Sequence, residues 1–196
     1  MTKHQVLGIS GSLRSQSTNS LFLRVMARAC PDTVSFKIYS DLGRIPIFNP
    51  DDEAQPGHVV TEWREMLLGA DMILLASPEY VHGVPGAIKN ALDWIASSGE
   101  LMGKLLALPN LSPRASIGHA QLAETLHILG TRKIEECSPR ATLEDPLILP
   151  EQSVEHVLSH PAIGPKIETL WCDIERCLAT EKAGLRQPSS LTRYLW

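Results

Sequence analysis

Apolar residues follow two alternating patterns along the chain: short continuous runs, and longer stretches in which they recur every three or four positions. The short runs predict buried strands, and the longer stretches predict amphipathic helices. The predicted strands are Gln5–Ile9, Val34–Ile38, Met72–Ala76, Lys104–Leu108 and Thr131–Cys137. The predicted helices lie within Asn19–Ala29, Val59–Ala70, Val84–Ile95, Leu122–Leu129 and Ile167–Leu178. The last strand is assigned only because the alternation requires one.

The five strand–helix pairs predict an open parallel sheet with helices on both faces, because parallel strands need a helical crossover between them. In the strand order 2-1-3-4-5 the chain changes direction between the first and third strands. Ligands bind at such a switch point, beyond the carboxyl ends of the strands. The loops after the first and third strands are therefore the expected place for the chemistry.

Loop 10–19 follows the first predicted strand and is rich in hydroxyl side chains. Hydroxyl groups, backbone N–H groups and the amino end of a helix together form an anion-binding arrangement, to which Arg14 can add charge-assisted hydrogen bonds. The loop has neither a Walker A sequence nor a GxGxxG fingerprint, so it predicts a cradle for one phosphate group. The alternative is a solvated loop in which Ser17 or Thr18 is an ordinary helix N-cap.

Loop 77–86 follows the third predicted strand and combines two prolines with two glycines. The prolines stiffen the loop, and Gly83 and Gly86 allow the backbone to approach a flat ligand closely. Tyr80 is suited to stacking on or flanking an aromatic ring, and backbone N–H groups of the loop are expected to bind ring acceptors. The alternative is a rigid turn whose Tyr80 packs in the core.

The two loops carry motifs of specific order and spacing. The first is Gly8-Ile9-Ser10-Gly11-Ser12-Leu13-Arg14, followed by Ser17 and Asn19. The second is Ser77-Pro78-Glu79-Tyr80, followed by Val84-Pro85-Gly86-Ala87-Ile88-Lys89-Asn90-Ala91-Leu92-Asp93-Trp94. Over roughly residues 4–135 the chain resembles the NADPH-dependent FMN reductase family, which includes quinone, azo-dye and chromate reductases. The resemblance implies a flavodoxin-like three-layer α/β/α fold with a five-stranded parallel sheet.

The resemblance also implies a flavin-dependent oxidoreductase that passes hydride from NADPH or NADH to bound FMN and then electrons to a small acceptor. The acceptor would be free flavin, a quinone, an azo compound or a metal oxyanion. The residues implied at the FMN phosphate are Ser10, Ser12, Arg14, Ser17, Thr18 and Asn19. Those implied along the ribityl chain and ring are Pro78, Glu79, Tyr80, Val81, His82 and Gly83. Ser112, with Arg114 as a weaker candidate, would contribute from a third loop, Leu111–Gly118. Because the cofactor carries the chemistry, we predict no catalytic side chain.

Val81 departs from the family pattern, which usually has Asn at this place, and the third loop is poorer in glycine than expected. These departures leave two alternatives to a reductase. One is a non-catalytic or weak flavin-binding protein with a degenerate site, and the other is a flavodoxin-type one-electron carrier, which we expect to be more acidic. His82 either contacts the ring or the acceptor, or lies at the loop surface.

The chain has 196 residues, 18 Lys and Arg, 22 Asp and Glu, and a formal net charge of −4. This balance disfavours a nucleic-acid partner, and no apolar run is long enough to span a membrane. The length predicts a single domain over residues 1–180 and a polar tail over residues 181–196. Four scattered cysteines and an amino end without a signal-peptide pattern favour a cytoplasmic protein. The family resemblance implies that the protein forms a homodimer or a homotetramer.

His156 and His160 have the i, i+4 spacing that can bind a metal ion on a helix. Pro161 follows immediately, and the sequence offers no evident third ligand. We therefore predict no metal site.

Overall fold

The computed structural model describes residues 3–143, 145–182 and 184. Five parallel strands form one sheet in the order β2-β1-β3-β4-β5, which confirms the predicted order. The strands are β1 (His4–Ser10), β2 (Val34–Tyr39), β3 (Met72–Ala76), β4 (Leu105–Ala107) and β5 (Arg132–Lys133). The α-helices are α1 (Thr18–Arg28), α2 (Gly57–Leu68), α3 (Gly86–Asp93), α4 (Ile117–Ile128), α5 (Val154–Ser159) and α6 (Gly164–Lys182). Two short 3₁₀ helices, η1 (Leu42–Arg44) and η2 (Pro50–Asp52), lie between β2 and α2.

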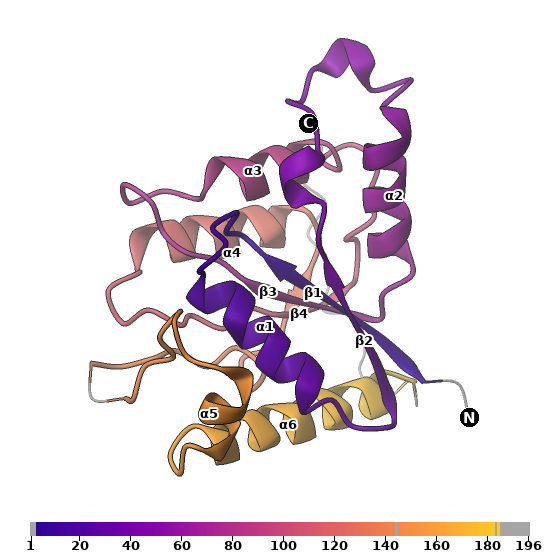
Figure 1. Cartoon of the computed structure of the whole chain (residues 1–196). Coiled ribbons are helices and arrows are strands. Elements are labelled where there is room, and N and C mark those ends of the chain that lie inside the picture. The colour runs from indigo at the N-terminus through magenta and orange to yellow at the C-terminus, as the bar shows by residue number, and fades with distance from the viewer. Residues whose placement is uncertain (1–2, 144, 183, 185–196) are drawn as a thin grey trace.

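The helices form one layer on each face of the sheet, with α1, α5 and α6 on one side and α2, α3 and α4 on the other (Figure 1). Alternate residues of a strand point to opposite faces, so each central strand contributes to two cores. In β3, Met72 and Leu74 pack with the α1/α6 layer, whereas Ile73 and Leu75 pack with the α2/α3/α4 layer. The uninterrupted apolar run of β3 is explained by this burial on both faces.

Two buried tryptophans fix neighbouring helices within these layers. The indole N–H of Trp63 on α2 donates to the Ala91 carbonyl of α3 at 3.0 Å. The indole N–H of Trp171 on α6 donates to the Met26 carbonyl of α1 at 3.0 Å. Each indole ring is buried, and its N–H group has a hydrogen-bond acceptor. The two helices therefore bury a large apolar surface without leaving a buried N–H donor unpaired.

The carboxyl-terminal third differs from the sequence prediction. Strand β5 covers only Arg132–Lys133 instead of Thr131–Cys137, because the chain turns after Lys133 through a Cys137 N–H to Ile134 carbonyl hydrogen bond of 3.2 Å. Helix α5 was not predicted, since its six residues are too few to show a period. Helix α6 continues to Lys182, past the predicted domain end at residue 180, and residues 183 and 185–196 of the predicted tail lie outside the described residues.

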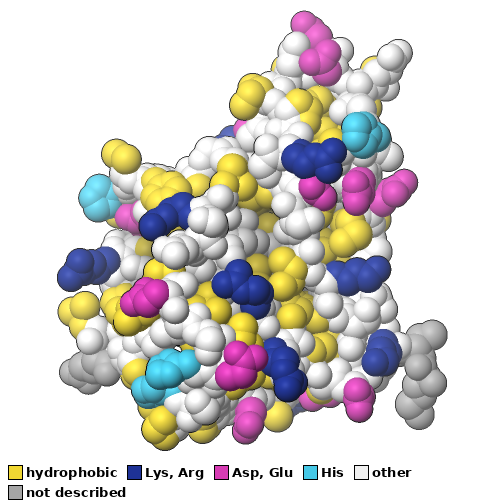
Figure 2. All heavy atoms as spheres, viewed as in Figure 1, with side chains coloured by type: hydrophobic (Ala, Val, Ile, Leu, Met, Phe, Trp, Pro, Cys, Tyr) yellow, Lys and Arg dark blue, Asp and Glu magenta, His cyan; other side chains and the backbone are white. Residues whose placement is uncertain are grey.

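On the face shown in Figure 2, Lys and Arg side chains are interspersed with acidic and uncharged ones. Within the described ranges, no helix is both long enough and apolar enough to cross a membrane. The same part of the chain contains no group of three or more His, Cys, Asp or Glu residues placed to hold a metal ion.

Candidate functional site

A cavity of about 370 Å³ opens at the carboxyl ends of the central strands, where the switch between β1 and β3 predicted a site. We call it the strand-end cavity. Its walls come from four segments: loop 10–19, loop 77–86, the loop between β4 and α4, and a stretch after β5. The lining residues are Ser12, Arg14, Gln16, Ser17, Thr18, Asn19, Ser77, Pro78, Glu79, Tyr80, Leu111, Ser112, Pro113, Arg114, Ala115, Leu147, Ile148, Leu149 and Pro150.

Loops 10–19 and 77–86 approach each other closely where they leave β1 and β3. The Gly11 N–H donates to the Ala76 carbonyl at 2.9 Å, which continues the β1–β3 pairing by one residue. A Cβ atom at Gly11 would collide with Ser77 Oγ, so only glycine permits this approach. The contact brings the two sequence motifs together at one edge of the sheet.

The serines of loop 10–19 have different environments. Ser12 Oγ accepts from the Arg14 N–H and Ser17 Oγ accepts from the Ser20 N–H, both at 3.3 Å. A serine hydroxyl that accepts in this way still has a hydrogen to donate, so both side chains can donate into the cavity. Ser10, which was also predicted to bind a ligand, lies behind the loop, where its Oγ contacts Ser20 Oγ at 2.9 Å. It does not line the cavity and instead shapes the loop.

Ser17 is also the N-cap of α1, so the amino end of this helix borders the cavity. The partial positive charge of a helix amino end, Arg14 at the exposed rim and the Ser12 and Ser17 hydroxyls favour an anion here. Thr18 is less suited to donate to a ligand than predicted, since its hydroxyl donates to the Ile148 carbonyl at 3.3 Å. Asn19 lines the cavity and is buried.

Residues 80–83 form a tight hairpin at the tip of loop 77–86. The Tyr80 N–H donates to the Gly83 carbonyl at 3.2 Å, and the Gly83 N–H donates to the Tyr80 carbonyl at 2.9 Å. Val81 and His82 at the tip have φ angles of 52° and 56°, in the left-handed region that disfavours a β-branched residue. Two N–H groups that we expected to bind ring acceptors are therefore used inside the hairpin.

The Val81 side chain is fully exposed, and Val81, His82 and Gly83 do not line the strand-end cavity. The departure from the family pattern at position 81 therefore removes no group from the cavity wall. Its consequence falls on the backbone, because Asn tolerates a positive φ far better than Val does.

Glu79 joins the hairpin to the beginning of α4. Its Oε2 accepts from the N–H groups of Ser116 and Gly118, each at 2.8 Å, and its Oε1 lies 3.0 Å from His82 Nδ1. The Glu79 side chain is only 9% exposed, and this desolvation alone would raise the pKa of its carboxyl group. The hydrogen bonds from His82 and from the α4 backbone outweigh it and lower the pKa below the ordinary value. The Glu79 carboxylate therefore caps α4.

The close approach of α4 to the hairpin also depends on a missing side chain. A Cβ atom at Gly118 would lie 2.6 Å from the Gly83 carbonyl oxygen. The preceding loop is held by buried Asn110, whose Nδ2 donates to the Ala115 carbonyl at 2.7 Å and whose Oδ1 accepts from the Ser112 N–H at 3.1 Å. Ser112 and Arg114 of this third loop line the cavity.

The structure thus gathers most of the predicted site residues around one cavity and leaves four outside its wall. Those in the wall are Ser12, Arg14, Ser17, Thr18, Asn19, Pro78, Glu79, Tyr80 and Ser112. Those outside it are Ser10, Val81, His82 and Gly83. Sequence reasoning missed the stretch Leu147–Pro150, which reaches the cavity from far along the chain. Its apolar residues and prolines carry no local signal of a binding site.

Residues 4–136 match the family model described as NADPH-dependent FMN reductase. The chain belongs to this family. The match confirms the resemblance inferred from the two motifs and covers both loops and the third loop. It ends at residue 136, so the Leu147–Pro150 wall of the cavity and helices α5 and α6 lie beyond it.

Curated relatives align with about half of the chain. An NAD(P)H-dependent FMN reductase of Pseudomonas aeruginosa is 40% identical over 97 residues, which is 49% of this chain and 52% of that protein. A 2-hydroxy-1,4-benzoquinone reductase of a Burkholderia species is 34% identical over 86 residues, or 44% of this chain and 46% of that protein. The chain thus spans about half the length of the curated relatives it matches.

Among solved structures, the flavoenzyme NAD(P)H:(acceptor) oxidoreductase FerB from Paracoccus denitrificans superposes with a TM-score of 0.67. The superposition covers 91% of this chain and 98% of that one, with 21% sequence identity. The likeness confirms the flavodoxin-like three-layer α/β/α fold over nearly the whole chain.

Proposed function

We propose that the protein is a flavin-dependent oxidoreductase that holds FMN in the strand-end cavity, takes hydride from NADPH or NADH and reduces a small acceptor. The observation that carries this proposal is that a single cavity combines anion-binding groups with apolar and aromatic ones. Loop 10–19 contributes hydroxyl groups, Arg14 and the amino end of α1, whereas loop 77–86 and the loop between β4 and α4 contribute Pro78, Tyr80 and Ala115. Such a cavity matches a molecule with an anionic tail and a flat ring.

The residues of loop 10–19 suit a phosphate group. Ser12 and Ser17 each have an O–H available after accepting a backbone N–H, and Arg14 is free to move at the exposed rim. Charged hydrogen bonds of this kind contribute roughly 1.5–3 kcal/mol each. Asn19 and the first N–H groups of α1 complete this set, and Glu79, an acidic residue in the cavity wall, has its carboxylate bonded to the α4 backbone.

The other two loops of the cavity suit a planar ring. Pro78 and Tyr80 come from loop 77–86, and Ser112, Pro113 and Ala115 come from the loop between β4 and α4. Glu79 also lines the cavity, but its carboxylate is bonded to α4, so it is a positioning residue that ties loop 77–86 to the beginning of that helix. When bound, FMN supplies the capacity to accept hydride from a reduced nicotinamide and to pass electrons on. The chain itself contributes binding, orientation and exclusion of water.

Curated relatives named as FMN and quinone reductases support a quinone or a free flavin as the acceptor. The alternative of a degenerate flavin-binding protein is not favoured, because Val81, the residue that raised it, lies outside the cavity wall.

Anaerobic mixing of the FMN-loaded protein with NADPH or NADH tests the proposal. We expect the visible absorbance of the oxidised flavin to fall after mixing and to recover when 1,4-benzoquinone is added. Stoichiometric FMN binding without bleaching by either nucleotide would contradict the oxidoreductase and leave a flavin-binding protein. Absence of FMN binding would contradict both.

The homodimer or homotetramer and the cytoplasmic location also belong to this proposal. Exposed apolar side chains, among them Leu13, Ile47 and Ile117, support association with a second copy. Light scattering of the FMN-loaded protein tests the oligomer, and a monomer at micromolar concentration would contradict it.

A further inference from the structure

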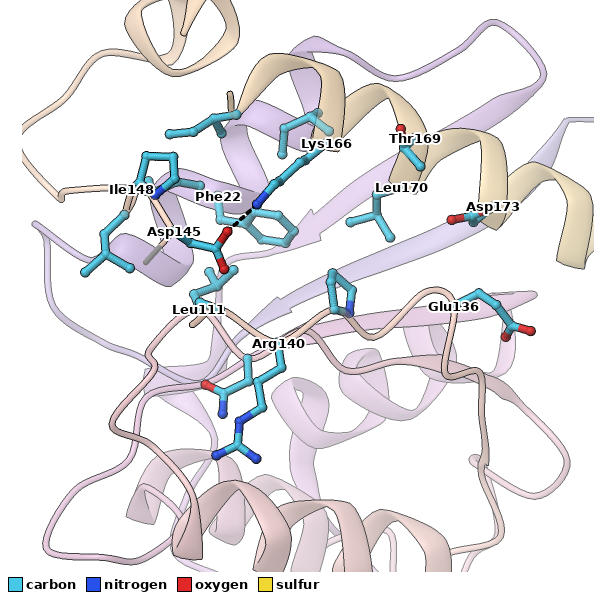
Figure 3. Close-up of a pocket in the computed structure, with 17 residues that line it drawn as sticks. Phe22, Leu111, Glu136, Arg140, Asp145, Ile148, Lys166, Thr169, Leu170 and Asp173 are labelled. Atoms are coloured by element: carbon cyan, nitrogen blue, oxygen red, sulfur yellow. Dashed lines mark hydrogen bonds and ion pairs between the residues drawn. The ribbon is translucent and has the colours of Figure 1, made fainter. Parts of the chain in front are cut away.

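A second cavity, of about 350 Å³, lies between α1, α6 and the stretch of chain after β5 (Figure 3). We call it the helix-side cavity. Leu111, Leu147 and Ile148 border both cavities and form the wall between them. Most of its other lining residues come after residue 136, beyond the family match. The helix-side cavity is therefore built mainly by the part of this chain that the family model does not cover.

The floor of the helix-side cavity is apolar. Phe22 of α1 lines it together with Ile163, Ile167 and Leu170, and all four side chains are buried in one hydrophobic cluster. Cavities with such walls hold water poorly and take up apolar molecules instead. The volume lies near the lower end of the roughly 300–1,000 Å³ typical of small-molecule pockets. The ligand that fits is therefore compact.

Several polar groups around this cavity are already paired, among them Lys166, Asp145 and Asn110. Lys166 reaches from α6 to Asp145 across the rim, above the Phe22 ring (Figure 3). That hydrogen bond, with two more from Thr142, lowers the pKa of Asp145 to about 2, so the ion pair persists at neutral pH. Asn110 is bonded within its own loop. A charged ligand would have to separate these pairs, whereas an uncharged one would not.

The charged residues at the open edge of the cavity also favour an uncharged ligand. Glu136 and Asp173 lie there, and Asp173 pairs with Arg176 at 3.0 Å. Arg140 contributes its stem, while its guanidinium group points away from α6 and lies 3.4 Å from the Ala115 carbonyl oxygen (Figure 3). The acidic side chains at the edge repel an anion, and the ammonium group of Lys166 is already paired with Asp145. The site therefore disfavours an anionic ligand.

We propose that the helix-side cavity is a binding site for a compact, uncharged aromatic molecule, distinct from the strand-end cavity. Phe22 provides the aromatic contact, and the aliphatic side chains of α6 provide the rest of the apolar surface. The site goes beyond the proposed function and does not depend on it, because none of its floor residues belongs to the predicted FMN site.

Calorimetric titration with 2-naphthol, a two-ring probe that is uncharged at neutral pH, tests this site. The protein is first saturated with FMN so that the strand-end cavity is filled. We expect saturable one-to-one binding of 2-naphthol and no measurable binding of 2-naphthoate, which has the same rings and a carboxylate. Absence of 2-naphthol binding, loss of binding on FMN saturation, or equal binding of 2-naphthoate would each overturn the proposal.

A matched pair of variants on α6 locates the probe. Thr169 borders the cavity, and its hydroxyl donates to the Pro165 carbonyl at 2.9 Å. Thr180 has the same kind of bond, to the Arg176 carbonyl at 2.8 Å, and lies outside the cavity. We expect Thr169→Trp to fill the cavity and abolish 2-naphthol binding, and Thr180→Trp to leave it unchanged.

Unchanged binding to Thr169→Trp would overturn the site. FMN affinity, followed by flavin fluorescence in all three proteins, separates the two proposals. If FMN fails to bind while the Thr169→Trp effect holds in the FMN-free protein, the proposed function fails and the helix-side site stands.

Discussion

Loops 10–19 and 77–86 face each other across the strand-end cavity and are held in shape by different means. In loop 10–19 no residue has a positive φ, and the serine hydroxyls accept N–H groups two or three residues away. In loop 77–86 two consecutive non-glycine residues have a positive φ, and Glu79 is bonded to N–H groups 37 and 39 residues away. The serine bonds of the first loop are short-range, although Gly11 and Thr18 also bond to Ala76 and Ile148, whereas the second loop depends on α4.

This difference allows two contributions to ligand binding to be measured separately: direct contact with the ligand, and positioning of the loop that contacts it. A locally shaped loop keeps its geometry when one side chain that points to the ligand is removed, so its variants report the lost contact. A loop held by a distant helix changes geometry when the holding group is removed, so its variants affect everything that the loop touches. The predictions below use FMN and riboflavin, which differ by the phosphate, to distinguish these cases.

The largest effect is expected from Arg14→Ala. Loss of a charge-assisted bond should weaken FMN binding about 10- to 100-fold and leave riboflavin binding unchanged, because riboflavin has no phosphate. Fluorescence titration of both flavins measures this ratio. Arg24→Ala, at an exposed position of α1, is the control and should change neither affinity. An equal loss for FMN and riboflavin would show that Arg14 acts on the ring or on the fold.

A smaller effect that does not distinguish the two flavins is expected from Glu79→Ala. The Ser116 and Gly118 N–H groups lose their acceptor, so the amino end of α4 and the third loop loosen. We expect FMN and riboflavin to bind about tenfold more weakly, each by a similar factor. Glu124→Ala, exposed on the same helix, serves as control. A loss confined to FMN would contradict the positioning role of Glu79.

The strain at the hairpin tip predicts a stabilising substitution. Val81→Asn replaces a β-branched residue at φ 52° with one that tolerates this region, which should raise the free energy of unfolding by about 1 kcal/mol. Urea denaturation measures the change. Leu13→Asn, which also removes an exposed apolar side chain but at a residue with negative φ, should have little effect. Flavin affinity should stay constant in Val81→Asn, and a large gain would place residue 81 at the ligand.

The smallest effect is a pH dependence of riboflavin binding. The folded-state pKa of Glu79 is lowered, so the stabilisation by its carboxylate is fully present above the ordinary pKa of about 4.5 and is lost as the pH falls through the lowered value. Riboflavin affinity of the wild type should therefore persist through pH 4.5 and decline only at lower pH, where the Glu79 carboxylate of the folded protein is protonated and the cap on α4 is lost. Glu79→Gln should flatten that decline, and an unchanged profile in this variant would assign it to another group.

The sheet, its strand order and the place of the site could be predicted from the sequence because they depend on local signals. The apolar run Met72–Ala76 and the hydroxyl-rich loop 10–19 each show their role in a few consecutive residues. The family motifs added the third loop, whose Ser112 lines the candidate cavity.

What could not be predicted depends on contacts between distant residues. Nothing near Glu79 in the sequence indicates that its carboxylate caps α4, and nothing in Leu147–Pro150 indicates that it closes a cavity beside Thr18. Cys137 and Cys177, which seemed scattered, lie with their sulfur atoms 3.8 Å apart because β5 ends early and the chain turns beneath α6. The helix-side cavity arises in the same way, from packing between segments that carry no motif.

A crystal structure of the protein with FMN most directly tests the claim that the two loops hold opposite ends of one nucleotide. We predict the phosphate among Ser12, Arg14 and Ser17, and the ring between Tyr80 and the Ser112–Ala115 stretch. FMN bound in the reverse orientation, or in the helix-side cavity with loop 10–19 vacant, would contradict it.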